Sequence, residues 1–407
     1  MATPPQESVS LRRTLGPVLV TFYGLGTIIG AGIYVLLGSV AGFSGPLLHW
    51  SFLLAGIIAG FTALTYAELS SRLPQCAGAA VYVHEAWWRT WLSSLVGWLL
   101  VLTGIVSAAA IANGFVGYMN IFMTLDPALV ITLLVLVLGS FACWDMKASA
   151  IVIFAVTLVE VGGLLMVVMF AVMTEPLPPI SGASLPSGPG NLTGLLLGSF
   201  VAFYAFIGFE DMVNIVEEIK QPNRNLLLGI LLAVVLAITL YFIVALAALR
   251  VVPVNELAQS EAPLAAMMQA SGGSEVLISL VSLVAVINGA LVQIIMASRV
   301  LYGMAGKSMA PALLGSINPA TRTPVIATVL VAALVLVFAI ALPLTQLAQI
   351  TSFIMLLIFI LVNLALVVIK HRSYQDYDGI NLPVAIPMLG ALSAFMLVGY
   401  QVFNLLN

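Results

Sequence analysis

The sequence predicts an all-α polytopic membrane protein. Of the 407 residues, 62% are hydrophobic and only 7% are charged, whereas about a quarter of the residues in a soluble domain are charged. Apolar runs of about 18 residues or more recur along the whole chain, which is the pattern of membrane-spanning helices. A chain with so few charges cannot cover its surface with them, so we expect the lipid bilayer to surround it.

The apolar runs divide into eleven expected spans. The ninth and tenth are separated at Pro343, because together they are much longer than the roughly 20 residues of one crossing. The N-terminal segment is polar and leads into a span without a small-residue cleavage site, so we expect no removable signal peptide. The spans are 15–41, 47–70, 91–119, 128–143, 148–173, 192–219, 225–249, 276–306, 324–342, 345–369 and 385–404.

The positions of lysine and arginine predict the orientation. If the N-terminus is cytoplasmic, twelve of the thirteen basic residues fall at cytoplasmic ends and only Arg250 falls outside. This bias follows the positive-inside rule for short loops. Eleven spans then place the C-terminus outside, in a multi-pass protein of the cell membrane. Of the longer connections, we expect 73–90 to form a helix at the cytoplasmic interface and 250–275 to form an outer lid.

Spans one and six both carry helix-weakening residues near mid-membrane. The stretch "GLGTIIGAGIYVLLG" (24–38) contains five glycines, and in span six Gly208 precedes the acids Glu210 and Asp211. We expect helix breaks at Gly26, Gly30 and Gly208. An alternative for span one is a close-packing face of small residues, since Gly26 and Gly30 have that spacing.

Five crossings separate the two weakened spans, so they run in opposite directions. Such a pair is typical of inverted-repeat transporters with discontinuous helices. Breaking a helix in lipid is tolerable only where the freed backbone groups line a cavity or bind a ligand. A half-helix N-terminus suits a carboxylate and a C-terminus suits an ammonium group, so two breaks can hold an amino acid.

Four motifs resemble those of the amino acid–polyamine–organocation (APC) superfamily of transporters. They are "GTIIGAGIYVLLG", "YAELSSRLPQCAGAAVYV" (66–83), "YAFIGFEDMVNIVEEIKQPNRN" (204–225) and "INGALVQIIMASRVLYGMA" (287–305). The resemblance implies a five-plus-five inverted repeat of the LeuT type and alternating-access transport of amino acids or related amines. It assigns a cytoplasmic tail to 1–14, the first repeat to 15–173, an outer loop to 174–191, the second repeat to 192–370, and a linker with helix eleven to 371–407.

The resemblance also implies which backbone groups bind substrate. First-helix amides that receive a carboxylate match Ile28, Ala31 and Gly32. The family commonly has twelve helices, whereas we expect eleven here; the difference lies outside the repeats and leaves transport unaffected.

Sixth-helix carbonyls that receive an amine match Tyr204, Ala205 and Ile207. Tyr204 also matches an aromatic gate that closes over the substrate from outside, and an aromatic ring there can stack on a cation. The alternative for Tyr204 is a packing aromatic of the interior.

A departure from the family pattern concerns coupling. Relatives place a lysine in the fifth helix, and the matching position here is Glu160, thirteen residues after Lys147. A carboxylate at that depth is costly unless it is protonated or paired, and acids within membranes are functional candidates by default. Glu160 is interpreted as a site for a proton, a sodium ion or a cationic substrate, or as a structural hydrogen-bonding residue. Asn288 in the eighth helix is its expected partner.

The adjacent acids of span six form the other departure. Glu210 matches a family acid linked to proton-dependent release or to local helix support. Asp211 stands where small residues are usual. Neighbouring residues on a helix point about 100° apart, so we expect only one of the two acids to face the pathway.

The expected function is secondary active transport of amino acids, with proton coupling or exchange, as a symporter or an antiporter. The alternatives are transport of cationic amino acids, polyamines or other small amines, and sodium-coupled symport. We expect no enzyme activity, because no histidine lies at mid-span and no nucleotide-binding loop is present; a channel and a non-transporting sensor are competing classes. We expect no cofactor, no metal site, no nucleic-acid partner and no obligatory protein partner, and free thiols at Cys76 and Cys143.

Overall fold

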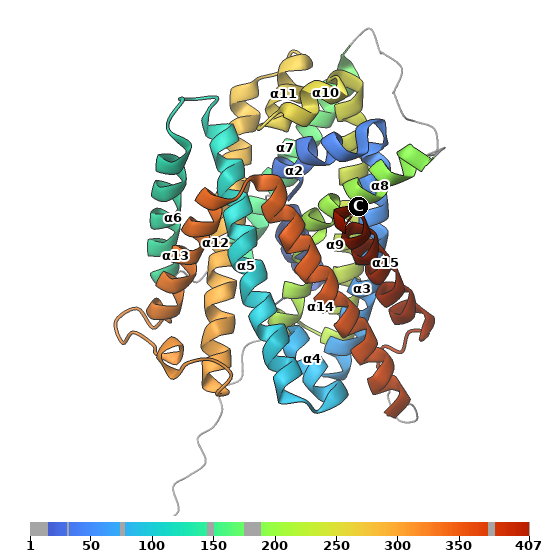
Figure 1. Ribbon diagram of the computed structural model, residues 1–407, viewed down its shortest axis with the longest axis vertical. Coiled ribbons are helices and arrows are strands. Elements are labelled where there is room, and N and C mark those ends of the chain that lie inside the picture. Colours follow the sequence, from blue (N-terminus) through green and yellow to red (C-terminus); the bar gives the residue numbers. More distant parts are fainter. Residues whose placement is uncertain are drawn as a thin grey trace, which may run out of the picture.

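The computed structural model describes residues 15–30, 32–73, 78–144, 150–174, 189–372 and 379–406. Ala31, Cys76, Lys147 and most of the expected outer loop therefore lie outside the described residues. Within the described ranges, helices make up the architecture, and an isolated bridge joins Leu15 to Ile219. The helices form one bundle, as Figure 1 shows. The predicted all-helical class is confirmed.

Eight stretches of the described chain are long and apolar enough to cross a membrane, and three shorter apolar helices accompany them. The first half of the chain begins with the pair α1 and α2, which together replace one long helix. The elements are α1 (Pro17–Ile29), α2 (Gly32–Ser44), η1 (Gly45–Leu47), α3 (Leu48–Arg72), α4 (Gly78–Trp87), α5 (Thr90–Met119), α6 (Pro127–Cys143) and α7 (Ala150–Met173).

The second half begins with another interrupted helix. The elements are α8 (Pro189–Ala202), η2 (Phe203–Phe206), η3 (Phe209–Glu218), α9 (Pro222–Val251), α10 (Val254–Gln259), α11 (Pro263–Ala270), α12 (Glu275–Gly306), η4 (Ala312–Gly315), α13 (Val325–Ala341), α14 (Leu344–Arg372) and α15 (Ala385–Leu406). Helix starts follow local chemistry. Proline occupies the first turn of α1, α6 and α9, where no intrahelical N–H bond is lost.

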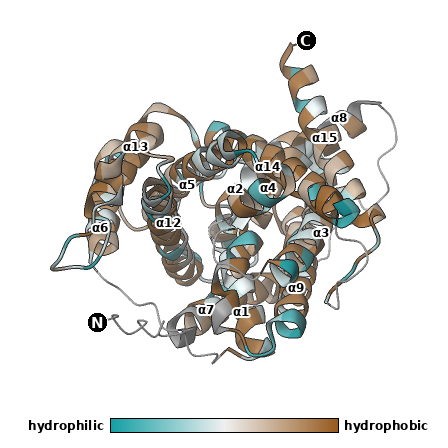
Figure 2. Ribbon diagram, turned by 90° about the horizontal axis from the view of Figure 1, so that it is seen from below, coloured by the Kyte–Doolittle hydropathy of each residue, from teal (hydrophilic) through white to brown (hydrophobic). Residues whose placement is uncertain are grey.

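Small residues let the central helices approach closely. A Cβ built on Gly104 of α5 would lie 2.9 Å from the Cβ of Ala297 on α12. Also on α5, a Cβ at Gly114 would overlap the side chain of Val35 on α2. Close approach of backbones is how helices associate where lipid removes the hydrophobic drive. In Figure 2, α6 and α13 lie outside this centre, next to α12 and α5.

Basic residues gather at one end of the bundle, the lower end in Figure 1. Arg72 ends α3, Lys307 follows α12, and Arg372 ends α14, whereas Arg250 lies at the other end of α9. We call these the basic end and the opposite end. At the basic end, α4 packs against α5 and α14 and buries Tyr82, so the expected interface helix is part of the bundle.

The expected outer lid consists of the short helices α10 and α11 at the opposite end. The segment packs tightly on α2: a Cβ on Gly38 would lie 2.6 Å from the carbonyl oxygen of Leu257 and 2.9 Å from that of Ser260. Leu264 and Met267 of α11 are fully buried. In this structure the segment therefore covers the bundle.

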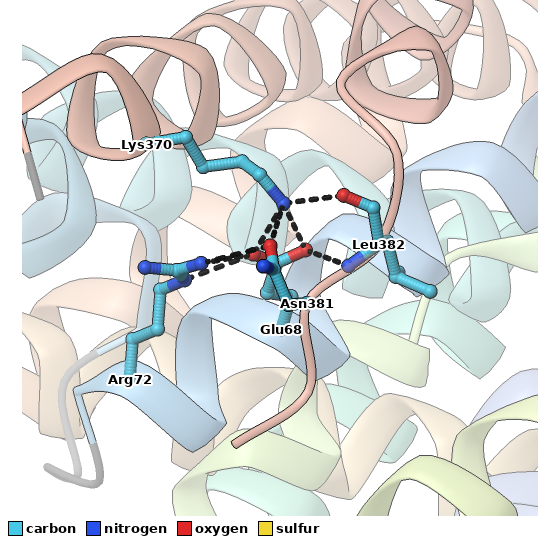
Figure 3. Close-up of polar contacts among 5 residues, drawn as sticks. All are labelled: Glu68, Arg72, Lys370, Asn381 and Leu382. Carbon is cyan, nitrogen blue, oxygen red and sulfur yellow. Dashed lines mark hydrogen bonds and ion pairs between the residues drawn. The ribbon is translucent and has the colours of Figure 1, made fainter. Parts of the chain in front are cut away.

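A buried ionic cluster ties α3, α14 and the start of the last segment together at the basic end (Figure 3). Lys370 Nζ lies 2.7 and 3.0 Å from the two carboxylate oxygens of Glu68, and Arg72 Nε donates to Glu68 Oε1 at 2.9 Å. Lys370 also donates to Asn381 Oδ1 at 2.8 Å and to the carbonyl of Leu382, whose N–H donates to Glu68 Oε2 at 2.9 Å. Each charge has several partners, which makes burial tolerable.

We predict that Lys370→Met destabilises the protein by about 1–3 kcal/mol, because the buried Glu68 carboxylate loses one of its two cations and keeps Arg72 as the other. Thermal unfolding of the purified protein in detergent measures the effect. Arg372→Met is the matched control, since Arg372 is exposed two residues further along α14. Equal unfolding midpoints for the two variants would show that the cluster adds nothing to stability.

Candidate functional site

The first interrupted helix breaks at Gly30. Helix α1 ends at Ile29, α2 begins at Gly32, and Gly30 has φ +21° and ψ −131°. The Gly30 N–H still donates to the carbonyl of Gly26 at 3.2 Å. Gly26 itself lies inside α1, so its expected role as a break is wrong. A Cβ there would overlap Oγ1 of Thr157, and Gly26 therefore serves close packing of α1 on α7.

The second interrupted helix breaks at Gly208. The chain passes from η2 through Ile207 in extended conformation to Gly208, which has φ +127°, and then enters η3. This backbone conformation favours glycine. A Cβ on Gly208 would also overlap the carbonyl oxygen of Thr27 and lie 3.3 Å from the nitrogen of Ile28. The second break thus packs directly on the last turn of α1.

The two breaks meet a second time at Gly32 and Ala205. A Cβ on Gly32 would lie 2.6 Å from the Cα of Ala205 and 2.9 Å from its Cβ. Glycine is needed here because a backbone segment occupies the space that a side chain would fill. The interrupted ends of α1, α2 and η2 therefore form one tightly packed unit.

A buried tyrosine from α9 bridges the breaks. Tyr241 Oη lies 3.0 Å from the carbonyl oxygen of Ile28 and 3.0 Å from that of Ala205. Its side chain is fully buried against Phe52 and Phe206. The hydroxyl supplies a donor to carbonyls that the breaks remove from helical pairing. Tyr241 was not among the predicted site residues, although a tyrosine in the mainly aliphatic α9 was a usable signal.

Two neighbouring cavities lie near the breaks, and the smaller one, of about 70 Å³, lies at the breaks themselves. Most of the residues expected to bind substrate line it. The other residues of its wall are Tyr23, Thr27, Ser107, Ile111, Gly289, Val292 and Gln293. Ala205 is not in the wall but packs against Gly32, and Ala31 lies outside the described residues. The expected residues in the wall are Gly26, Ile28, Gly30, Gly32, Tyr204, Ile207, Asp211 and Asn288.

A larger cavity of about 390 Å³ extends from the smaller one toward the basic end. Ile207, Asp211 and Gln293 line both cavities. Farther out, the wall includes the start of α4, Met296 and Met304 of α12, and finally Lys307, which ends the cavity at the basic end. The two cavities are thus adjacent and share part of one wall.

Tyr204 closes the smaller cavity toward α5. Its hydroxyl lies 2.8 Å from Oγ of Ser107 and donates to the Ser107 carbonyl at 3.1 Å. The tyrosine side chain is only 5% exposed. These bonds hold the Tyr204 ring in the wall of the smaller cavity, against α5.

Glu160 lies one residue behind the cavity wall. It is fully buried in α7, and Asn288, which lines the smaller cavity, donates to Glu160 Oε1 at 3.5 Å. The Glu160 carbonyl accepts from Tyr34 Oη at 2.5 Å, and the Tyr34 carbonyl accepts from Tyr118 Oη at 2.5 Å. Glu160 Oε2 has no hydrogen-bond partner among the described residues. The expected Glu160–Asn288 contact is present, whereas the two tyrosines were not foreseen.

The two adjacent acids at the second break face different partners. Glu210 Oε2 accepts the N–H of Gly208 at 2.8 Å, and its side chain lines only the larger cavity. Asp211 lines both cavities, and its backbone N–H donates to the Gly208 carbonyl at 3.1 Å. Glu210 thereby supports the turn, and Asp211 stands at the junction of the cavities. Among the described residues no group of three His, Cys, Asp or Glu side chains could hold a metal ion.

Comparison with known sequences places this geometry among transporters. Residues 15–406 match the amino acid permease family. A vacuolar cationic amino acid transporter of Arabidopsis thaliana is 30% identical over 397 residues, which cover 91% of this chain and 65% of the relative. The branched-chain amino acid permease BcaP of Bacillus subtilis is 28% identical, over 89% of this chain and 82% of its own. The resemblance inferred from the motifs is confirmed.

The relatives differ in the substrates for which they are named. A methylthioribose transporter of Bacillus subtilis is 25% identical over 95% of this chain and 87% of the relative. The chain spans about 60–65% of the length of the plant cationic amino acid transporters that it matches. These names indicate transporters rather than enzymes. The family and the long apolar helices together indicate a multi-pass membrane protein.

We predict that Tyr241→Phe lowers the stability by about 1–3 kcal/mol, the cost of leaving a buried carbonyl without its donor. Thermal unfolding in detergent measures the change, and Tyr302→Phe, which alters an exposed tyrosine on α12, is the control. An unchanged unfolding midpoint for Tyr241→Phe would contradict the role of the hydroxyl as a bridge between the breaks.

Proposed function

Because the chain belongs to the amino acid permease family, we propose that it transports amino acids across a membrane by alternating access. The observation that carries the proposal is the pair of helix breaks, at Gly30 and Gly208, that meet at a cavity within an apolar bundle. Unpaired backbone is costly in lipid and is tolerated where it lines a cavity. A pair of broken helices around such a cavity is the arrangement of a substrate site.

In the proposed pose, the substrate carboxylate binds the backbone N–H groups of Ala31 and Gly32, of which Gly32 begins α2. The amine binds carbonyls at the end of η2, at Tyr204 and Ile207. The smaller cavity, about 70 Å³, compares with about 30 Å³ for each water in the liquid. It therefore has room for the part common to all amino acids, and Tyr204 closes over it as the gate.

The arrangement of the cavities supports an inward-facing state. The larger cavity runs to the basic end, which the positive-inside rule assigns to the cytoplasm. On the opposite side Tyr204 is bonded to Ser107, and α10 packs on α2. We place the protein in the cell membrane with eleven crossings, a cytoplasmic N-terminus and an outer C-terminus. Its five-plus-five repeat would move around the two breaks.

Coupling is assigned to Glu160. A buried carboxylate with one weak partner and one unpartnered oxygen calls for a proton or a cation. Asn288 connects it to the cavity, so a change at Glu160 can reach the substrate directly. Proton symport fits this geometry without further ligands, whereas sodium would need several oxygens around it.

We predict that at least one amino acid raises the unfolding midpoint of the purified protein, because a ligand that binds the folded state stabilises it, by about 2.7 kcal/mol at 100 times Kd. The twenty amino acids are screened with and without sodium, and hits are tested for counterflow in proteoliposomes. Absence of both a shift and counterflow for every amino acid would overturn the proposed function.

We predict that Glu160→Gln removes the pH dependence of uptake in proteoliposomes. If Glu160 carries the coupled proton, uptake by the natural protein rises as the pH on the side of entry falls, since protonation then precedes transport. The glutamine keeps the hydrogen bond to Asn288 but cannot release a proton. Glu256→Gln, at an exposed acid of α10, is the control. A pH profile that Glu160→Gln leaves unchanged would assign coupling elsewhere.

A further inference from the structure

The two cavities would hold different parts of a bound amino acid. This step rests on the proposed function, because it takes the common carboxylate and amine to lie at the breaks. The smaller cavity has too little room for a long side chain as well, since sites for drug-sized ligands have volumes of about 300–1,000 Å³. A long side chain therefore continues into the larger cavity, past the residues shared by both: Ile207, Asp211 and Gln293.

Asp211 is the charged group at this junction. Within the described part of the chain, ion pairs join Glu68 to Arg72 and Lys370, and none involves Asp211. The neighbouring acid is already engaged, since Glu210 accepts the N–H of Gly208 at 2.8 Å. The Asp211 carboxyl group thus lies on the cavity wall without an ion pair to a cation among the described residues.

An unpartnered hydroxyl lines the same larger cavity. Tyr66 is 1% exposed, and its Oη has no hydrogen-bond partner among the described residues. Its ring meets Phe209, which directly precedes the two acids, with ring centroids 5.8 Å apart in an edge-on arrangement. Buried hydroxyls normally have partners. A ligand group that donates hydrogen bonds, such as an ammonium or guanidinium group, supplies a donor to both the hydroxyl and the carboxylate.

The basic residues of the larger cavity lie nearer its mouth. Arg299 on α12 and Lys307, which directly follows α12, come six and fourteen residues after Gln293. At about 1.5 Å per residue they are about 9 and 21 Å farther along the helix axis. The end of the larger cavity next to the breaks is therefore acidic, and the end toward Lys307 is basic. A cationic side chain suits the inner end, while an anionic side chain would meet Asp211 and be repelled.

We propose that Asp211 binds the side-chain cation of the substrate, and that the protein prefers amino acids with a cationic side chain over neutral and acidic ones. In this role Asp211 determines specificity, whereas the breaks bind the part that all amino acids share. Tyr66 contributes a second acceptor for the same cation.

The test compares ligands with a cationic side chain with neutral analogues of similar shape. Binding of lysine against norleucine, and of arginine against citrulline, is measured by calorimetry on the purified full chain in detergent. Loss of a hydrogen bond to a charged group corresponds to roughly a 10- to 100-fold change in Kd. We expect the natural protein to bind lysine and arginine at least tenfold more tightly than their neutral counterparts.

Variants then assign the preference to Asp211. Asp211→Asn keeps the size and removes the charge, so we expect Kd for lysine to rise at least tenfold while Kd for norleucine changes little. Asp211→Glu keeps the charge and should retain the preference. Asp126→Asn is the matched control, because Asp126 is exposed, lines neither cavity, and caps α6 in a way that asparagine reproduces.

The outcomes separate this inference from the proposed function. Tight binding of neutral amino acids with no preference for lysine would overturn the role of Asp211 and leave amino acid transport standing. Equal losses for lysine and norleucine in Asp211→Asn would make Asp211 structural, and would also overturn it. Absence of binding for every amino acid would overturn both proposals. The comparison of ligands on the natural protein decides the question even if a variant fails to fold.

Discussion

The contact between the two interrupted helices is the constraint on which the rest of the structure depends. Gly208 packs on the carbonyl of Thr27, and Gly32 packs on the backbone of Ala205. Neither contact leaves room for a Cβ, so both positions require glycine. Tyr241 bonds to both segments and supplies a donor where helical pairing ends. Unwinding in an apolar bundle is therefore compensated locally, by backbone packed on backbone.

The charges of the bundle are used in two different ways. At the basic end, Glu68 and Lys370 are buried but surrounded by partners, and they hold α3, α14 and the segment before α15 together. Near the breaks, and among the described residues, Glu160 has one weak side-chain partner and Asp211 lines the cavities without an ion pair. A satisfied buried charge fixes structure, whereas an unsatisfied one leaves a place for a proton or a ligand.

How much of the site could be predicted follows from the range of the interactions. The break at Gly30 and the sharp turn at Gly208 were readable, because helix-weakening residues act within a few positions of the chain. Gly26 was wrongly included, since a glycine inside α1 that packs on Thr157 has the same sequence signature as a break. Tyr241 was missed because it acts from another helix, and nothing near it in the chain marks its partners.

The sequence by itself determined the helical membrane class, the family, and the positions where glycine and buried acids concentrate, because these follow from composition and local pattern. Only the tertiary structure decided which of these residues meet. In the folded protein Asn288 donates a hydrogen bond to Glu160, and Glu210 accepts the N–H of Gly208 at the turn. Asp211 lies at the junction of the two cavities. Adjacent acids are equivalent in a sequence. They became different because a helix points them in different directions, toward different neighbours.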